Sequence, residues 1–275
     1  MRQIKVLLAL AAIVAASASL RAQGTAFPPV TRQMLENPSP DDWLMLSRTY
    51  DEQRFSPLKQ VNKSNVGQLR MVWSRGLPAG TNETVPIVYR GILYVVTPHA
   101  LVQALDATTG DLIWEHRRKW GPGVNEAALE SARAKGLAIF EDMIYWTAPD
   151  GYLVALDAQK GTMRWETLVN PPGSGAQNTS APIVVEGKVI TGRACSDKRE
   201  GCFIAAHDAL TGKEVWKFYT AAAEGEPGGD TWGGLPTEKR IASIWGLPGS
   251  YDVARRTIDR KSTRLNSSHL GISYA

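Results

Sequence analysis

The chain has 275 residues, with 31 Lys and Arg against 27 Asp and Glu, and 43% of it is hydrophobic. This is ordinary globular composition, and it excludes a disordered, collagen-like or disulfide-dense chain. The excess basic residues lie at the two ends of the chain, which contain no Asp or Glu. The part between the ends therefore has a slightly negative net charge. A nucleic-acid-binding surface therefore has little electrostatic support, and we expect no nucleic-acid partner.

Residues 1–22 have the features of a secretory signal peptide. Arg2 and Lys5 precede an apolar stretch from Val6 to Ala16, and small residues follow it. The stretch is too short to span a bilayer comfortably, and no other apolar run is long enough. We therefore expect a periplasmic or secreted chain with no transmembrane span beyond the signal peptide. A buried N-terminal helix is the alternative.

Three segments in the middle of the chain align without gaps at a spacing of 51 residues. We expect the Asp of each segment to accept hydrogen bonds from the following turn, the Gly to take a positive φ, and the Trp to pack between adjacent sheets. The shared residues are Asp106, Gly110 and Trp114, then Asp157, Gly161 and Trp165, then Asp208, Gly212 and Trp216.

Each repeat also carries two β-rich runs upstream, around tight turns, at 85–97, 136–148 and 181–192. Four short antiparallel strands in a repeat of about 50 residues are typical of a β-propeller blade. A β-sandwich would not explain the fixed period. The best helical candidate, 126–136, is short.

The number of repeats predicts an all-β chain that holds about half of a large propeller. A partial repeat ends near Trp73, three full repeats follow, and another begins at 245–252. We therefore expect a fragment in which residues 23–259 form a partial propeller. Residues 260–275 show no period, and we expect a non-native tail there, with a genuine polar extension as the alternative.

The order of Asp, Gly and Trp in the repeat resembles the Trp-docking motif of the quinoprotein dehydrogenases. Trp43, Tyr50 and residues 53–73 also look like the N-terminal strand and first blade of the alcohol dehydrogenases that use pyrroloquinoline quinone, PQQ. The resemblance covers about residues 40–258. It implies an eight-bladed propeller, present here as about four blades, in an exported enzyme.

The resemblance also implies the chemistry. The enzyme would oxidise an alcohol or a related hydroxyl substrate by hydride transfer to PQQ, with calcium, or a lanthanide in its place, beside the quinone. A periplasmic cytochrome or a quinone would accept the electrons. The general-base Asp and an Asn metal ligand are expected beyond residue 258, so the chain as it stands is expected to be inactive.

Cofactor contacts are carried over residue by residue. Glu83 would hydrogen-bond PQQ, Thr179 would contact a PQQ carboxylate, and Trp245 would stack on the quinone. Lys135, which fits the gapless alignment, or Arg133 would contact the quinone oxygens. The alternatives are an exposed loop acid, an ordinary strand-start hydroxyl, a core Trp and solvated basic residues.

The resemblance places the metal in the loop at 193–203. Asp197 aligns with the calcium-binding Glu of the family, and Glu200 is the other candidate, because calcium prefers carboxylate oxygens. A charged surface loop is the alternative. One departure is Leu129-Glu130, where many family members carry adjacent cysteines, and this disfavours the methanol and ethanol dehydrogenase subtypes.

The two cysteines, Cys195 and Cys202, lie close together in the sequence. In an exported chain this spacing predicts a loop-closing disulfide, which would contribute about 2 kcal/mol and make the candidate calcium loop more rigid. The sequence contains no CxxCH motif for c-type haem and no GxGxxG fingerprint for a nicotinamide cofactor.

Two alternative functions stay open. A non-catalytic scaffold propeller of outer-membrane assembly would carry a lipid-anchored Cys at the signal cleavage site, which this sequence lacks. A PQQ-dependent sugar dehydrogenase of the membrane-anchored kind would carry transmembrane helices before the first blade, and the sequence has none there.

Overall fold

The computed structural model describes residues 27–120, 134–171, 176–177, 180–196, 198–244, 248–261 and 269–273. The expected signal peptide lies outside these ranges, as does most of the helical candidate at 126–136; its last residues, 134–136, are not helical. Within the described ranges, no helix is both long enough and apolar enough to cross a membrane.

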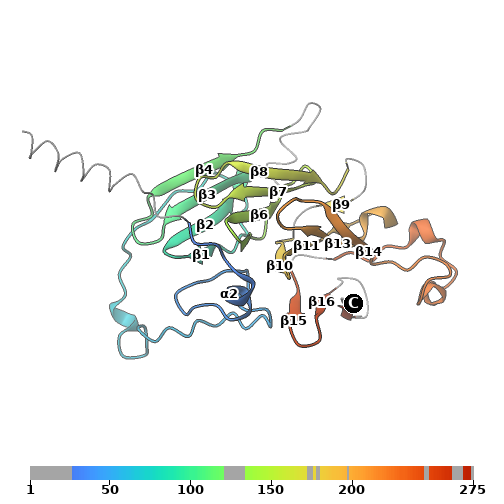
Figure 1. Cartoon of the computed structure of the whole chain (residues 1–275), viewed down its shortest axis with the longest axis horizontal. Coiled ribbons are helices and arrows are strands. Elements are labelled where there is room, and N and C mark those ends of the chain that lie inside the picture. Colours follow the sequence, from blue (N-terminus) through green and yellow to red (C-terminus); the bar gives the residue numbers. More distant parts are fainter. Residues whose placement is uncertain are drawn as a thin grey trace, which may run out of the picture.

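Three antiparallel sheets share one up-and-down order and lie next to one another (Figure 1). This confirms the prediction of four short strands in each repeat. The first sheet is β1 (Ile87–Tyr89), β2 (Ile92–Thr97), β3 (Leu101–Asp106) and β4 (Leu112–Arg117). The second is β5 (Ala138–Phe140), β6 (Met143–Thr147), β7 (Tyr152–Asp157) and β8 (Met163–Leu168), and the third is β10 (Ile183–Val185), β11 (Lys188–Gly192), β13 (Phe203–Asp208) and β14 (Glu214–Tyr219).

Smaller elements complete the chain. A fourth sheet contains β15 (Ser250–Asp252), β16 (Thr257–Lys261) and β17 (His269–Ser273), and a two-stranded ribbon pairs β9 (Ala176–Gln177) with β12 (Ala194–Cys195). The one α-helix among the described residues is α2 (Arg32–Glu36), capped by the Thr31 hydroxyl. The 3-10 turns are η1 (Val66–Gln68), η2 (Pro98–Ala100), η3 (Arg199–Gly201), η4 (Gly229–Trp232) and η5 (Thr237–Lys239).

The repeated Asp, Gly and Trp residues join neighbouring sheets as the sequence predicts. Trp73, Trp114 and Trp165 each donate from Nε1 to a turn carbonyl in the next sheet, as in the 2.9 Å bond from Trp114 to Ala158 O. A Cβ built on Gly161 would lie 2.4 Å from the Trp114 ring, so the ring rests directly on the glycine. Trp73 meets Gly110, and Trp165 meets Gly212, in the same way.

The turns that receive these rings are also built alike. Gly110, Gly161 and Gly212 have φ values of 77°, 69° and 71°. Oδ1 of Asp157 accepts the amides of Gln159 and Lys160 at 3.0 and 2.8 Å, and Asp106 and Asp208 accept the corresponding pairs. The predicted hydrogen-bonding and conformational roles of the repeated Asp and Gly residues are therefore confirmed, and the predicted packing is confirmed for Trp114 and Trp165.

The segment before the first sheet contacts the first strands of the first, third and fourth sheets. Trp43 pairs with Val88 of β1. Tyr50 donates from its hydroxyl to Val184 O in β10 at 2.6 Å, and the Tyr50 carbonyl accepts the amide of Tyr251 in β15 at 2.9 Å. Because Tyr50 is 6% exposed, these contacts tie the N-terminal segment into the core.

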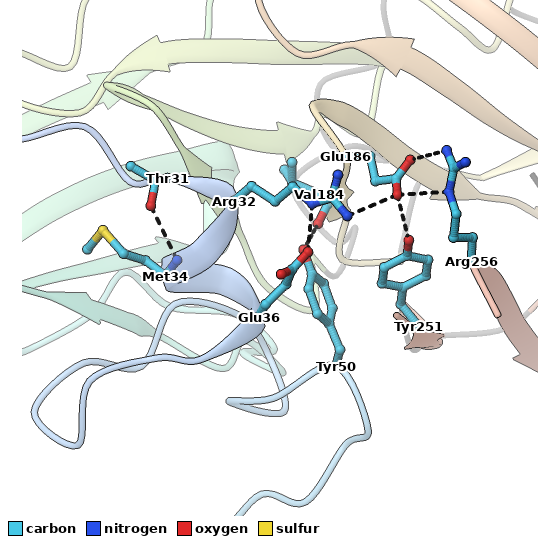
Figure 2. A network of polar contacts seen from close by, with 9 residues as sticks. All are labelled: Thr31, Arg32, Met34, Glu36, Tyr50, Val184, Glu186, Tyr251 and Arg256. Atoms are coloured by element: carbon cyan, nitrogen blue, oxygen red, sulfur yellow. Dashed lines mark hydrogen bonds and ion pairs between the residues drawn. The ribbon is translucent and has the colours of Figure 1, made fainter. Parts of the chain in front are cut away.

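One partly exposed carboxylate joins three of these elements (Figure 2). Glu186, in the β10–β11 turn, accepts Arg256 through both oxygens at 2.7 and 3.1 Å and the Tyr251 hydroxyl at 3.0 Å. Arg32 of α2 reaches the same carboxylate at 3.2 Å. These hydrogen bonds, led by the one from Arg256, lower the pKa of Glu186. We call Glu186 and these three partners the Glu186 hub.

Two regions differ from the sequence expectation. Residues 53–73, which the resemblance likens to the N-terminal strand and first blade, contain only the short turn η1, although Trp73 docks on Gly110. The segment expected to have no regular structure, 260–275, extends β16 to Lys261 and supplies β17, which pairs with β16 in antiparallel register. Backbone pairing along the exposed edge of β16 accounts for this strand.

Candidate functional site

The first strands of the three four-stranded sheets, β1, β5 and β10, are their inner strands. The residues just before these three strands lie close together. Val85 forms a parallel bridge with Gly136, and its amide donates to Lys135 O at 3.0 Å. A Cβ built on Gly136 would lie 3.3 Å from Val85 O and 3.4 Å from Ala181 Cβ. The starts of β1, β5 and β10 therefore lie close together, and we call this region the inner mouth.

Two of the residues singled out in the sequence meet at the inner mouth. Lys135 Nζ forms a hydrogen-bonded ion pair with Glu83 Oε2, although 52 positions separate the two residues. The Lys135 side chain is 15% exposed and that of Glu83 is 30% exposed, so solvent only partly screens the pair. The fold thus brings a cation and a carboxylate together beside the inner strands.

In the first and third repeats, a residue with a buried hydroxyl stands at the position equivalent to Lys135 of the second repeat. Thr84, Lys135 and Ser180 each lie three residues before the first residue of an inner strand. Thr84 Oγ1 and Ser180 Oγ are buried and find no hydrogen-bond partner among the described residues. A buried polar atom without a partner costs about 1–3 kcal/mol, so a ligand with polar atoms would be stabilised here.

The other predicted cofactor residues fall on positions that the structure does not describe. Arg133, Thr179 and Trp245 lie outside the described residues. So does Asp197, the first metal candidate. The second metal candidate, Glu200, is described and is exposed in η3. The part of the chain that is described contains no group of three or more His, Cys, Asp or Glu side chains arranged to hold a metal.

The predicted disulfide is present. Cys195 and Cys202 are bonded, with their Cα atoms 5.2 Å apart, and they are 8% and 0% exposed. The bond joins β12 to the residue before β13, at the end of the third sheet where the inner strand begins. The predicted loop closure is therefore confirmed.

A buried arginine beside the disulfide was not singled out from the sequence. Arg193 is 0% exposed, donates from Nη1 to Gly192 O at 2.9 Å, and lies 5.1 Å from the centre of the Phe203 ring. Burial first, and the Arg193 charge second, lower the pKa of His207 to about 4. No local sequence signal distinguishes this arginine from the exposed ones around it, because its burial depends on the β11–β13 packing.

A second buried arginine closes the same end of the first two sheets. Arg118 follows β4 and binds Asp150 at 2.7 Å and Glu166 at 2.7 Å, and its guanidinium lies 4.7 Å from the centre of the Tyr152 ring. Because these partners come from the second sheet, the cluster is a structural link between blades. The sequence did not reveal it, since Arg118 is 32 positions from Asp150.

Comparisons of the sequence with known proteins agree with this fold. Residues 43–258 match the family model of the glucose/ethanol/alcohol dehydrogenase β-propeller domain, PQQ. Quinohemoprotein alcohol dehydrogenase ADH-IIG of Pseudomonas putida is 38% identical over 187 residues, which are 67% of this chain and 26% of that protein. Subunit 1 of the cytochrome c methanol dehydrogenase of Methylorubrum extorquens is 33% identical over 197 residues, 68% of this chain and 31% of that protein.

Solved structures give the same result. The structure of ADHIIG from Pseudomonas putida HK5 superposes with a TM-score of 0.73 at 30% identity, covering 88% of this chain and 38% of that one. A europium-containing methanol dehydrogenase superposes with a TM-score of 0.73 at 27% identity, covering 84% and 44%. The chain spans about a quarter to a third of the length of these curated relatives. The chain belongs to the PQQ-dependent glucose, ethanol and alcohol dehydrogenase β-propeller family.

Proposed function

We propose that the chain is part of an exported alcohol dehydrogenase and supplies one side of its quinone-binding site. The observation that carries this proposal is the Glu83–Lys135 pair, held at the inner mouth of a propeller that matches the family. The names of the relatives, alcohol and methanol dehydrogenases, support an alcohol as the substrate class.

The residues present fit PQQ. The cofactor is a flat quinone with three carboxylates, and the inner mouth offers it one ammonium group, from Lys135. Two buried hydroxyls, Thr84 Oγ1 and Ser180 Oγ, find no partner among the described residues and can donate to anionic oxygens. When bound, PQQ supplies a quinone that accepts a hydride from an alcohol carbon.

Lys135 and Glu83 then have distinct roles. Lys135 would stabilise the negative charge that reduction adds to the cofactor oxygens, because a fixed cation in a partly dry site interacts strongly with such charge. Glu83 would orient the ammonium group through the ion pair. The general base is not among these residues, and we propose that it lies in a part of the protein beyond this chain.

The described residues do not make up a calcium site. Glu200 is exposed, and the described ranges contain no cluster of three candidate ligands. Calcium stays a proposal from the family, and a lanthanide is an alternative that the europium-containing relative supports.

We also propose the setting of the protein. Residues 1–22 would direct export, residues 23–259 would form the partial propeller, and residues 260–275 would be a non-native tail. A cytochrome or a quinone would accept the electrons, which agrees with the names of the relatives, a quinohemoprotein and a cytochrome c methanol dehydrogenase.

Replacing Lys135 tests the proposal directly. The wild-type chain should bind PQQ, as measured by quenching of tryptophan fluorescence, and the Lys135→Met variant should bind it roughly 30-fold or more weakly. Loss of a buried charge partner typically costs about 2–5 kcal/mol, which corresponds to that change. Dye-linked alcohol oxidation by the chain with PQQ and calcium should stay at background.

Lys217→Met is the matched control. Lys217 pairs with Glu214 on the outer strand β14, so this change removes one charge away from the inner mouth. It should leave the PQQ affinity unchanged. Equal affinities of wild type and the Lys135 variant would contradict the assigned role, and turnover by the chain alone would contradict the missing general base.

A further inference from the structure

Residues 71–76 make the contacts of an outer strand with the sheet that follows them. In β4, in β8 and in residues 71–76, a Trp packs on the glycine of the next docking turn, and the residue two positions later contacts the carbonyl oxygen of that glycine. These second contacts are Arg75 with Gly110 at 3.5 Å, His116 with Gly161 at 3.1 Å and Thr167 with Gly212 at 2.8 Å. Residues 71–76 therefore dock on the first sheet as β4 docks on the second and β8 on the third.

The exposure of the side chains follows the same pattern. In residues 71–76, as in β4 and β8, the Trp and the residue two positions later are at least half covered, and the other four side chains are exposed. Met71 is 83% exposed, whereas the equivalent residues Leu112 and Met163 are 44% and 51% exposed. Because a paired neighbouring strand covers part of β4 and of β8, the larger exposure of Met71 fits a missing neighbour.

The backbone of residues 71–76 shows directly which neighbour is missing. The outer strand β4 pairs with the third strand β3, and β8 pairs with β7. Within the described part of the chain, no strand pairs with residues 71–76, and their amides and carbonyls form no backbone hydrogen bond. Such an edge offers a row of donors and acceptors that fits the free edge of another sheet.

The fourth sheet has the opposite deficit. Its described strands are β15, β16 and β17, in that order, whereas each of the other three large sheets has four strands. β15 is the first strand of this sheet, so the free edge of β17 lies where the other sheets place their outer strand. Within one copy, the second and third sheets lie between residues 71–76 and the fourth sheet. The segment therefore cannot reach its own β17 while Trp73 stays docked.

We propose that two copies of this chain associate head to tail, and that residues 71–76 of each copy form the outer strand of the fourth sheet of the other copy. The pairing continues the sheet-to-sheet interface that Trp73 already makes with Gly110. Each copy contributes four sheets, so two copies form a closed ring of eight, the number that the family resemblance implies and one that propellers reach. Closure satisfies both open edges, so assembly stops at two copies.

The repeat also fixes the register of the pairing. Across the first sheet, one row of opposite residues is Ile87, Tyr94, Ala104 and Trp114, and the next pair along β3 and β4 is Gln103 with Glu115. Counted from the end of the first strand, the equivalent row of the fourth sheet is Ser250, Asp259 and Gly271. Trp73 of one copy is therefore placed opposite Gly271 of the other, and Ser74 opposite Leu270.

A pair of cysteines at opposite positions tests this register. Ser74 and Leu270 are equivalent to Glu115 and Gln103, whose side chains hydrogen-bond at 3.0 Å. The double variant Ser74→Cys with Leu270→Cys should therefore form a disulfide-linked dimer under mild oxidation, seen by non-reducing electrophoresis. The two native cysteines are bonded to each other, so the introduced thiols are the reactive ones. Ser74→Cys with Glu238→Cys carries the same number of thiols and should stay unlinked.

Light scattering on a sizing column tests the association without new thiols. The wild-type chain should have the mass of two copies, and Val72→Asp should dissociate roughly tenfold or more readily, because pairing would remove water from the new carboxylate. Val215→Asp is the matched control. Val215 also precedes the Trp of an outer strand, β14, but that strand is already paired with β13, so this variant should stay a dimer.

The outcomes decide between this arrangement and its alternatives. A wild-type mass of one copy at every concentration would overturn the proposal, and assemblies that keep growing with concentration would overturn the closed ring. Covalent dimers of Ser74→Cys alone would overturn the head-to-tail pairing, because they require two segments 71–76 to meet each other. The inference concerns this chain with residues 260–275 included. Neither measurement involves PQQ, so its result is independent of the proposed function.

Discussion

At the scale of single residues, one repeated constraint is the contact between each docking glycine and the ring that packs on it. Gly161 has φ of 69°, and its missing Cβ leaves the space that the Trp114 ring occupies. The Trp114 side chain is 8% exposed and its indole N–H is satisfied by Ala158 O. The positive φ and the close packing of the ring therefore both require glycine at this position.

Gly161→Ala should lower the free energy of unfolding by about 2–4 kcal/mol, because it adds overpacking to the strain of a positive φ. Gly91→Ala is the matched control, since Gly91 has φ of 77° but nothing within 4 Å of its built Cβ. That variant should lose only about 1 kcal/mol. Urea unfolding measures both, and equal losses would show that the ring contact adds nothing.

At the scale of elements, the Glu186 hub connects parts that share no sheet. Its carboxylate lies in the β10–β11 turn, Arg32 lies in α2, and Tyr251 and Arg256 lie in and after β15 (Figure 2). All three partners interact with the negatively charged carboxylate of Glu186. Ionised Glu186 therefore contributes, together with Tyr50, to the position of the fourth sheet relative to the third.

Stability should depend on pH through this hub. The folded-state pKa of Glu186 is lowered, so its contribution is complete above the ordinary glutamate range and is lost as the pH falls through the folded value. Glu186→Gln should therefore cost about 1 kcal/mol near neutral pH, with partial screening by solvent, and the cost should shrink below about pH 4.

Thermal unfolding followed from neutral to acid pH measures this difference. Glu238→Gln, which changes an exposed carboxylate of η5 in the same way, is the control and should follow the wild-type curve. A constant gap between Glu186→Gln and wild type across the whole range would rule out the ionised hub.

At the scale of the molecule, Trp–Gly contacts join the first sheet to the second and the second to the third. Apolar side chains remain exposed in the segment that precedes the first sheet. Met71 and Val72 are each 83% exposed, although their neighbour Trp73 docks on Gly110. The other docking residues, Trp114 and Trp165, lie in the outer strands β4 and β8. Residues 69–75 thus occupy the place of an outer strand, and exposed apolar side chains at such a place favour association.

Met71→Lys should reduce concentration-dependent self-association of the chain without changing its far-UV circular dichroism. Leu210→Lys is the control, because Leu210 is a single exposed side chain, 59% exposed, in a docking turn. Analytical ultracentrifugation measures the association. Identical sedimentation of Met71→Lys and wild type would show that this segment does not drive it.

Whether a contact could be predicted from the sequence depended on how far apart in the chain its two residues lie. The sequence alone determined the repeat, the strand order within each sheet and the turn chemistry at Asp157 and Gly161, because those hydrogen bonds join residues within a few positions. It also determined the disulfide, since the two cysteines are seven positions apart. Local geometry and side-chain type suffice for such contacts.

Only the tertiary structure decided which distant groups meet. The pairing of Lys135 with Glu83, the burial of Arg193 and the link from Thr220 to Ala242 each depend on segments brought together by sheet packing. The charges or hydroxyls of these residues look like ordinary surface groups in the sequence. Their roles arise because the docked sheets exclude water around them, and no short stretch of sequence carries that information.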